Sequence, residues 1–212
     1  METKQPILEV KNLKQYFKVN RKFTVKAVDD ISFCIYPKET YGLVGESGSG
    51  KTVTSKAVMG LIATPPGEIK KESKILYQGE NILEYSEKEW QDYRGKKAGM
   101  IFQDPMTSLN PTMKVGRQIA EGILKHEKIS KKEAMQKAVE LLRKVNIPNP
   151  EERANQYPHE FSGGMRQRVV IAIALACNPK LMIADEPTTA LDVTIQAQII
   201  KLLKEIQKAN QS

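Results

Sequence analysis

A glycine-rich octapeptide carries the clearest chemistry in this sequence. It reads Gly45-Glu46-Ser47-Gly48-Ser49-Gly50-Lys51-Thr52. The pattern GxxxxGK[ST] lets backbone N–H groups turn inward around phosphate oxygens at the positive end of a following helix. By position, Lys51 would reach the β and γ phosphates of a nucleotide, and Thr52 would give a hydroxyl oxygen to Mg²⁺. The pattern predicts a nucleotide phosphate site but not the reaction, because kinases, GTPases and transport ATPases share it.

The segments that flank the octapeptide have the patterns that such a site requires. Tyr41–Val44 is a short apolar run, which predicts a strand leading directly into the glycines. Apolar residues then recur at helical spacing from Val53 to Leu61, and the proline-rich run 64–67 ends them. Strand, glycine loop and helix therefore follow one another in the expected order.

Two carboxylates follow a second apolar run. Leu181–Ala184 predicts a short buried strand, and Asp185 and Glu186 come directly after it. Charged groups at the end of a buried strand predict a functional site at that edge of the sheet. The plainer interpretation is that the two acids only begin a turn.

Ser162, Gly163 and Gly164 stand before a predicted helix, Gly163–Ala176. A hydroxyl and glycine amides at a helix start form a second possible anion-binding terminus. Taken alone, the same residues would be read as an ordinary capped helix start.

Taken together, these segments resemble the ATP-binding cassette (ABC) family along almost the whole chain. Phe161 to Met165 is similar to the family's signature, which usually reads LSGGQ, and the departures are at its two ends. The strand that ends in two acids resembles the family's Walker B segment. This resemblance implies that Asp185 holds the magnesium and that Glu186 orients and polarises the attacking water.

Three further positions take their roles from the resemblance. Gln103 matches the Q-loop glutamine, whose amide oxygen can reach the magnesium or the attacking water. Ala190-Leu191-Asp192 matches the D-loop, in which Asp192 lies across a dimer interface. Phe17 corresponds to the aromatic residue that stacks on adenine, with Tyr16 as the alternative, although both could simply pack under the sheet.

The resemblance implies that ATP and Mg²⁺ are bound by a dimer. In the family, two ATPase subunits pack head to tail, and the signature of one covers the γ phosphate held by the phosphate loop of the other. The residues that would do so here are Ser162, Gly163, Gly164 and Met165.

The implied fold is an α/β P-loop NTPase with an ABC-type core. We expect one cassette over 1–212, with a mixed sheet around the phosphate loop, an antiparallel β subdomain and an inserted helical subdomain. The nucleotide-binding core would take 1–103 and 163–212, and the helical part with the signature 104–162. In the family, a switch histidine that contacts the γ phosphate lies on the strand after the helix that corresponds to 194–208. This sequence stops at Ser212, before that strand would be complete. We therefore expect a truncated cassette that binds ATP but hydrolyses it slowly.

Two segments are similar to the peptide-importer branch of the family. Asp104–Pro111 follows the glutamine, and Gln156–Glu160 precedes the signature. The branch moves di- and oligopeptides, or nickel, with two ATPase subunits, two membrane permeases and an extracytoplasmic binding protein. From Gly45 to Gln198 the chain resembles the D-type subunit of oligopeptide systems, whereas Leu8–Asp30 is closer to the F-type partner. The expected place is the cytoplasmic face of the membrane.

Composition leaves one rival class. The formal net charge of +8 would suit nucleic acid or an anionic ligand, so a soluble ABC ATPase acting on nucleic acid or ribosomes is the alternative. Such proteins carry two cassettes or a long coiled coil, and this sequence has neither. We therefore expect no nucleic-acid partner. A small-molecule kinase would leave the signature-like segment unexplained.

Overall fold

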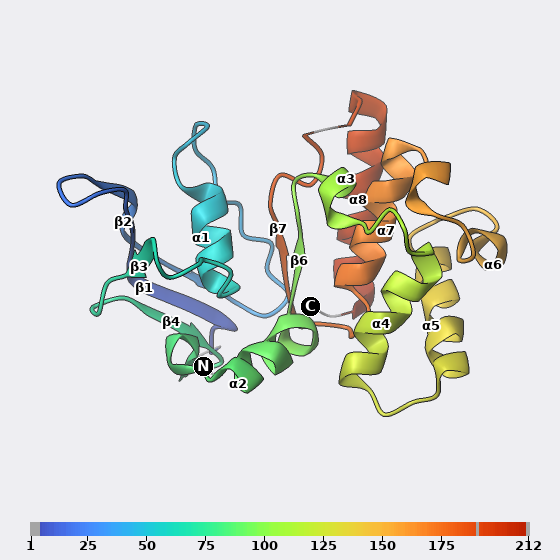
Figure 1. The fold of residues 1–212 in the computed structure, drawn as a ribbon, viewed down its shortest axis with the longest axis horizontal. Coiled ribbons are helices and arrows are strands. Elements are labelled where there is room, and N and C mark those ends of the chain that lie inside the picture. The colour runs from blue at the N-terminus through green and yellow to red at the C-terminus, as the bar shows by residue number, and fades with distance from the viewer. Residues whose placement is uncertain (1–4, 190, 211–212) are drawn as a thin grey trace. The chain divides into compact units, whose positions relative to one another are not determined.

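The computed structural model describes residues 5–189 and 191–210, without the side chains of Met106 and Asn210. The chain forms two compact units, unit 1 from Met1 to Gln91 and unit 2 from Asp92 to Ser212. Figure 1 shows the elements of both. The predicted division into a nucleotide-binding core and a helical part, at 103 and 163, stays a prediction.

Unit 1 is built on an antiparallel sheet of five strands. They are β1 (Leu8–Lys18), β2 (Thr24–Ile35), β3 (Gly67–Ile69), β4 (Lys74–Tyr77) and β5 (Glu80–Asn81). The order is β2-β1-β4-β5, and β3 pairs with β1. Unit 1 also holds α1 (Lys51–Val58), a 3₁₀ turn (Ile82–Glu84) and most of α2 (Glu87–Asp92). This sheet is the antiparallel β part that we predicted.

A β-bulge keeps the apolar side chains of β1 on one face. Val10 is buried, but the next buried residues are Leu13 and Gln15, so the alternation slips by one residue. The register with β2 shifts there, and Asn12 has a φ of 48°. An extra residue in one strand is what a bulge supplies, so β1 continues past Asn12 with its buried side chains on the same face.

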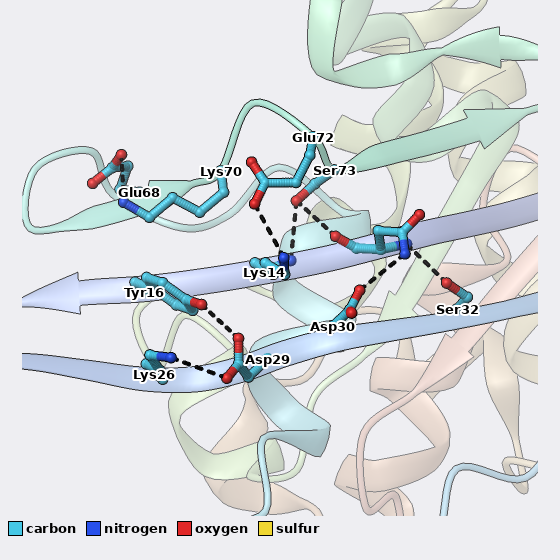
Figure 2. A network of polar contacts seen from close by, with 11 residues as sticks. Lys14, Tyr16, Lys26, Asp29, Asp30, Ser32, Glu68, Lys70, Glu72 and Ser73 are labelled. Atoms are coloured by element: carbon cyan, nitrogen blue, oxygen red, sulfur yellow. Dashed lines mark hydrogen bonds and ion pairs between the residues drawn. The ribbon is translucent and has the colours of Figure 1, made fainter.

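Polar side chains hold this bulge to the neighbouring strands (Figure 2). The amide of Asn12 donates to Asp30 Oδ1 over 2.9 Å, and its backbone N–H donates to Ser32 Oγ over 2.8 Å. From the other side, Ser73 Oγ donates to the carbonyl of Asn12 over 3.1 Å. These bonds satisfy backbone groups that the bulge takes out of the ladder.

One predicted strand is absent. Tyr41–Val44 is not a strand in the structure, and Val44 is 93% exposed. A strand requires a neighbour that takes up its backbone hydrogen bonds. None of the strands that the structure describes pairs with this segment. An apolar pattern alone therefore did not determine its conformation.

Unit 2 is mostly helical around two parallel strands, β6 (Ala98–Ile101) and β7 (Leu181–Ala184). Its helices are α3 (Pro105–Ser108), α4 (Val115–His126), α5 (Lys131–Lys144), α6 (Pro150–Arg153), α7 (Gly163–Ala174) and α8 (Val193–Asn210). Short irregular helices occupy Tyr93–Lys97 and Pro158–Glu160. The predicted helices in this part of the chain are therefore present, with ends that differ by a few residues.

The core of unit 2 lies where its helices meet. Ile119 and Ile123 of α4, Leu142 of α5, Ile171 of α7 and Ile199 of α8 are fully buried and belong to one hydrophobic cluster. Figure 1 shows α4 and α5 side by side. Ser130 and Glu133 form a capping box that starts α5. None of the helices that the structure describes is long and apolar enough to cross a bilayer.

Candidate functional site

The phosphate loop in unit 1 turns on two glycines with positive φ, 79° at Gly48 and 91° at Gly50. Gly50 is also the N-cap of α1. A Cβ added there would lie 2.4 Å from the carbonyl oxygen of Ala27 in β2. Both the backbone angle and this close approach require glycine. The loop is therefore held against the sheet at the point where α1 begins.

Lys51, the first residue of α1, folds its side chain back over the loop. Its Nζ donates to the carbonyl oxygens of Gly45 and Glu46, each over 2.8 Å. The backbone N–H of Ser49 donates to Glu46 over 3.2 Å and closes the turn. The ammonium group thus lies inside the curve of the loop, where the sequence predicted a phosphate contact. Ser47 lies in the same turn and Thr52 in the first turn of α1.

Tyr16, the alternative adenine-stacking residue, is engaged in polar contacts on its own face of the sheet. Its hydroxyl donates to the carboxylate of Asp29 (Figure 2). The ammonium groups of Lys26 and Lys70 lie 5.4 Å and 5.1 Å from the ring centre. Two cations over one ring make Tyr16 a poor platform for a base.

Phe17 faces the other side of the sheet, because neighbouring residues in a strand alternate. It shares this face of β1 with Gln15, which pairs with Val28 of β2. A methyl carbon of Val28 lies 3.2 Å from the Cβ position of Gly50. Phe17 is therefore on the face that meets the phosphate loop. This position favours it over Tyr16, and its contact with adenine stays a prediction.

In unit 2 the parallel register of β6 and β7 sets two candidate residues level with each other. Ile101 pairs with Ala184, and the N–H of Asp185 continues the ladder by donating to Ile101 over 3.0 Å. Gln103 and Glu186 each come two residues after the paired positions. They therefore leave the same edge of the sheet, at the carboxyl ends of both strands, which is where α/β sheets place their ligands.

Glu186 receives two side-chain hydrogen bonds on one oxygen. Gln103 Nε2 donates to Glu186 Oε2 over 2.9 Å, and Thr189 Oγ1 donates to the same atom over 3.1 Å. Glu186 has a φ of 47°, a conformation that costs a residue with a side chain about 1–3 kcal/mol. Asp185 beside it is buried, with 5% of its surface exposed.

Thr189 is the member of this group that sequence reasoning missed. The segment from Glu186 to Thr189 is a turn in which the N–H of Thr189 donates to the carbonyl of Glu186 over 3.3 Å. A hydroxyl residue three positions after an acid, with Pro187 between them, is the available sequence signal for this contact.

The signature segment starts α7. Ser162 is the N-cap, and its Oγ accepts from the N–H of Met165 over 3.3 Å. Gly164 approaches α8 closely, because an added Cβ would lie 2.9 Å from a methyl carbon of Ile195. Met165 is partly buried, and its side chain packs against the hydrophobic cluster of unit 2. The role of Ser162, Gly163, Gly164 and Met165 toward a second subunit stays a prediction.

Asp192 starts α8 close to the signature. Its Oδ1 accepts from the N–H of Ile195 over 3.0 Å. A side-chain carbon of Leu191 lies 3.9 Å from the Cβ position of Gly163, so the helix starts of α7 and α8 are neighbours. Ala190 of the predicted D-loop lies outside the described residues. The D-loop role of Asp192 stays a prediction.

The structure thus gathers the candidates in two groups. Unit 1 holds the phosphate loop with Phe17, and unit 2 holds Gln103, Asp185 and Glu186 with the signature and Asp192. Among the residues that the structure describes, no group of three or more His, Cys, Asp or Glu side chains could hold a metal ion.

Residues 28–189 of this chain match a family model described as ABC transporter. The match takes in more than half of the chain. The chain belongs to the ABC transporter family. The membership predicted from the phosphate loop, the signature-like segment and the two acids is therefore confirmed.

Two curated relatives of this ABC chain are named for peptide transport. It is 63% identical over 202 residues to "Oligopeptide transport ATP-binding protein OppD" of Bacillus subtilis (strain 168). It is 55% identical over 205 residues to "Dipeptide transport ATP-binding protein DppD" of Lactococcus lactis subsp. cremoris (strain MG1363). These matches cover 95% and 96% of this chain, and 56% and 58% of the relatives. The chain thus spans less than two thirds of their length, and the predicted resemblance to the peptide-importer branch is confirmed.

A solved structure has the same fold as this ABC chain. It is described as the dimeric structure of a post-hydrolysis state of the ATP-binding cassette MJ0796 bound to ADP and Pi. Its TM-score is 0.82 at 26% sequence identity, and the match covers 96% of this chain and 84% of that one. The predicted fold class, an α/β P-loop NTPase of the ABC type, is confirmed.

Proposed function

We propose that this chain binds ATP with Mg²⁺ and hydrolyses the nucleotide as an ATPase subunit of an importer for di- and oligopeptides. The hydrogen bond between Gln103 and Glu186 carries the hydrolytic part of the proposal. It sets a carboxylate and an amide side by side at the carboxyl ends of two parallel strands, next to the buried Asp185. That arrangement suits a base that must orient and deprotonate a water molecule.

In the proposed reaction, Glu186 accepts a proton from water while the water oxygen forms a bond to the γ phosphorus. The bond between that phosphorus and the β–γ bridging oxygen breaks, and ADP leaves with the oxygen. Lys51 at the start of α1 would balance the charge on the β and γ phosphates, and the glycine amides of the loop would hold their oxygens. The proposed products are ADP and inorganic phosphate.

The proposed ligands of Mg²⁺ are the hydroxyl of Thr52, the carboxylate of Asp185 and the amide oxygen of Gln103. These oxygen groups are the kind that magnesium prefers. Gln103 uses its amide nitrogen toward Glu186, which leaves the oxygen as the atom it can offer to a cation. Bound magnesium would neutralise charge that develops on the phosphates.

We further propose that the active form is a dimer with a second ATPase subunit, in which Ser162 and the amides of Gly163 and Gly164 contact the γ phosphate held by the partner. The proposal is supported by the exposed N-terminus of α7 and by the dimeric form of the structural neighbour. Asp192 starts α8 beside this terminus and would lie across the same interface. The Ser162 bond to Met165 is long, so exchanging it for a phosphate bond would cost little.

Peptide uptake as the coupled process rests on the relatives named for oligopeptide and dipeptide transport. The other proposed partners are two membrane permeases and, indirectly, an extracytoplasmic peptide-binding protein. The chain would then act at the cytoplasmic face of the membrane. The alternative is import of nickel or of another small solute.

Uptake into proteoliposomes tests this proposal. The vesicles would hold the chain, a second ATPase subunit and the two permeases, with ATP inside and the binding protein with a radiolabelled tetrapeptide outside. We expect ATP-dependent uptake that stops when Glu186→Gln replaces the normal chain. Uptake of ⁶³Ni²⁺ with its own binding protein, and none of the peptide, would contradict the peptide assignment but leave the ATPase assignment standing.

A further inference from the structure

Thr189 holds the same carboxylate oxygen as Gln103. Its Oγ1 lies 3.1 Å from Glu186 Oε2, and Gln103 Nε2 lies 2.9 Å from that atom. Two donors from different directions fix the plane of a carboxylate, whereas one donor would let it rotate.

The contact from Thr189 is built into a tight turn. Its N–H and its Oγ1 both lie 3.3 Å from the carbonyl oxygen of Glu186. The hydroxyl has one proton, for which this carbonyl and the nearer carboxylate oxygen, 3.1 Å away, are both acceptors, so the turn holds the hydroxyl close to the carboxylate. A threonine side chain has few rotamers, so this bond depends on a short, stiff connection.

Gln103 reaches Glu186 in a different way. It comes from the end of β6, far away in sequence, and extends a flexible side chain across to β7. It is also a proposed ligand of magnesium through its amide oxygen, so its position would depend on the cation as well as on Glu186. Thr189 belongs to the same turn as Glu186 and would keep its bond whatever position Gln103 takes.

We propose that Thr189 is a positioning residue, whose hydroxyl orients the Glu186 carboxylate for deprotonation of water. This inference rests on the proposed ATPase function. Thr189 itself touches neither nucleotide nor water in this scheme. Its loss should slow the chemical step and leave ATP affinity as it was.

Single-turnover hydrolysis of γ-³²P-labelled ATP, with the purified chain in excess, tests the proposal even where steady turnover is slow. A hydrogen bond to a charged group contributes about 1.5–3 kcal/mol, so we expect Thr189→Val to lower the single-turnover rate by about 10-fold or more. ATP affinity, measured by equilibrium dialysis, should stay unchanged. Thr189→Ser keeps the hydroxyl and should restore most of the rate.

Thr112→Val is the matched control. Thr112 is exposed, and its Oγ1 also bonds a side-chain oxygen, that of Asn110 over 2.8 Å, in a loop before α4. The Thr112→Val variant should hydrolyse ATP at the rate of the normal chain. A normal rate in Thr189→Val, or an equally slow rate in Thr189→Val and Thr189→Ser, would overturn the positioning role.

A second measurement needs no activity. Melting temperatures of Thr189→Val, Glu186→Ala and the double variant report whether the two side chains are coupled. We expect Thr189→Val to lower the melting temperature of the normal chain by more than that of Glu186→Ala, which keeps only the backbone carbonyl as an acceptor for the hydroxyl. Equal changes in melting temperature in the normal chain and in Glu186→Ala would show that the Thr189 hydroxyl does not interact with the Glu186 carboxylate. Coupling without any ATP hydrolysis by the normal chain, both alone and mixed with a second ATPase subunit, would contradict the proposed function, and the positioning role would fall with it.

Discussion

The amide of Gln103 donates to Glu186 Oε2 over 2.9 Å, although 83 residues separate the two in the chain. Parallel pairing of β6 with β7 brings them level, because each lies two residues beyond a paired position. Glu186, held at the strand end in this way, should be essential for cleavage of ATP and not for its binding.

We therefore expect Glu186→Gln to bind ATP normally and to hydrolyse it about 10²–10⁴-fold more slowly. The glutamine keeps the length of the side chain and an acceptor oxygen but cannot take the proton. Phosphate release measures the rate, and equilibrium dialysis measures the binding. Glu205→Gln, at an exposed acid of α8, is the control and should be fully active. Normal hydrolysis by Glu186→Gln would remove this residue from the proposed reaction.

Lys51→Ala should weaken ATP binding. The ammonium lies inside the phosphate loop, 2.8 Å from two of its carbonyl oxygens. Losing one charged hydrogen bond to phosphate costs about 1.5–3 kcal/mol, which corresponds to roughly 10-fold weaker binding or more. Isothermal titration calorimetry gives the affinity, with Lys56→Ala as the control, because Lys56 is an exposed residue in the last turn of α1. Equal affinities of the two variants would contradict the phosphate-loop assignment.

Gly163→Ala and Gly164→Ala should differ in stability although they are neighbours. The new Cβ at Gly164 would lie 2.9 Å from a methyl carbon of Ile195, a β-branched side chain that cannot rotate away. Such overpacking costs about 1–3 kcal/mol in the free energy of unfolding. At Gly163 the nearest atom is 3.9 Å away, so alanine fits. Urea unfolding of both variants checks this, and equal stabilities would show that α8 can shift.

Gln167→Leu should stabilise the chain. Gln167 on α7 is 1% exposed, and neither polar atom of its side-chain amide has a hydrogen-bond partner. Burying an unpaired amide costs about 1–3 kcal/mol, which leucine would avoid at similar volume. Gln15→Leu is the comparison, because Gln15 is equally buried but donates to Tyr16 over 3.3 Å. In urea unfolding, Gln15→Leu should raise the free energy of unfolding by less than Gln167→Leu does. A loss of stability in Gln167→Leu would mean that the amide is satisfied by water.

The sequence predicts best those features that depend on local chemistry. The phosphate loop needs glycines with positive φ before a helix, and the spacing of Gly48, Gly50 and Lys51 states this directly. The strand Leu181–Ala184 before the two acids was also predicted, but the prediction that it is buried was wrong, because the structure buries only Leu181 and leaves Ala184 exposed.

Features that depend on distant partners were harder to predict. Tyr41–Val44 has the pattern of a strand but no described strand beside it. The bulge at Asn12 depends on side chains from β2 and from Ser73, which immediately precedes β4. The bond from Gln103 to Glu186 follows from the register of β6 with β7, which a single sequence does not contain.

The positive φ of Glu186 has a consequence for protein engineering. Glycine and asparagine adopt this backbone conformation more readily than glutamate does. A library selected only for heat resistance would therefore enrich them at position 186, and both lack the carboxylate on which the proposed chemistry depends. Screens for a more heat-stable variant of this chain should keep position 186 fixed, because substitutions there that raise thermal stability would remove the carboxylate needed for ATP turnover.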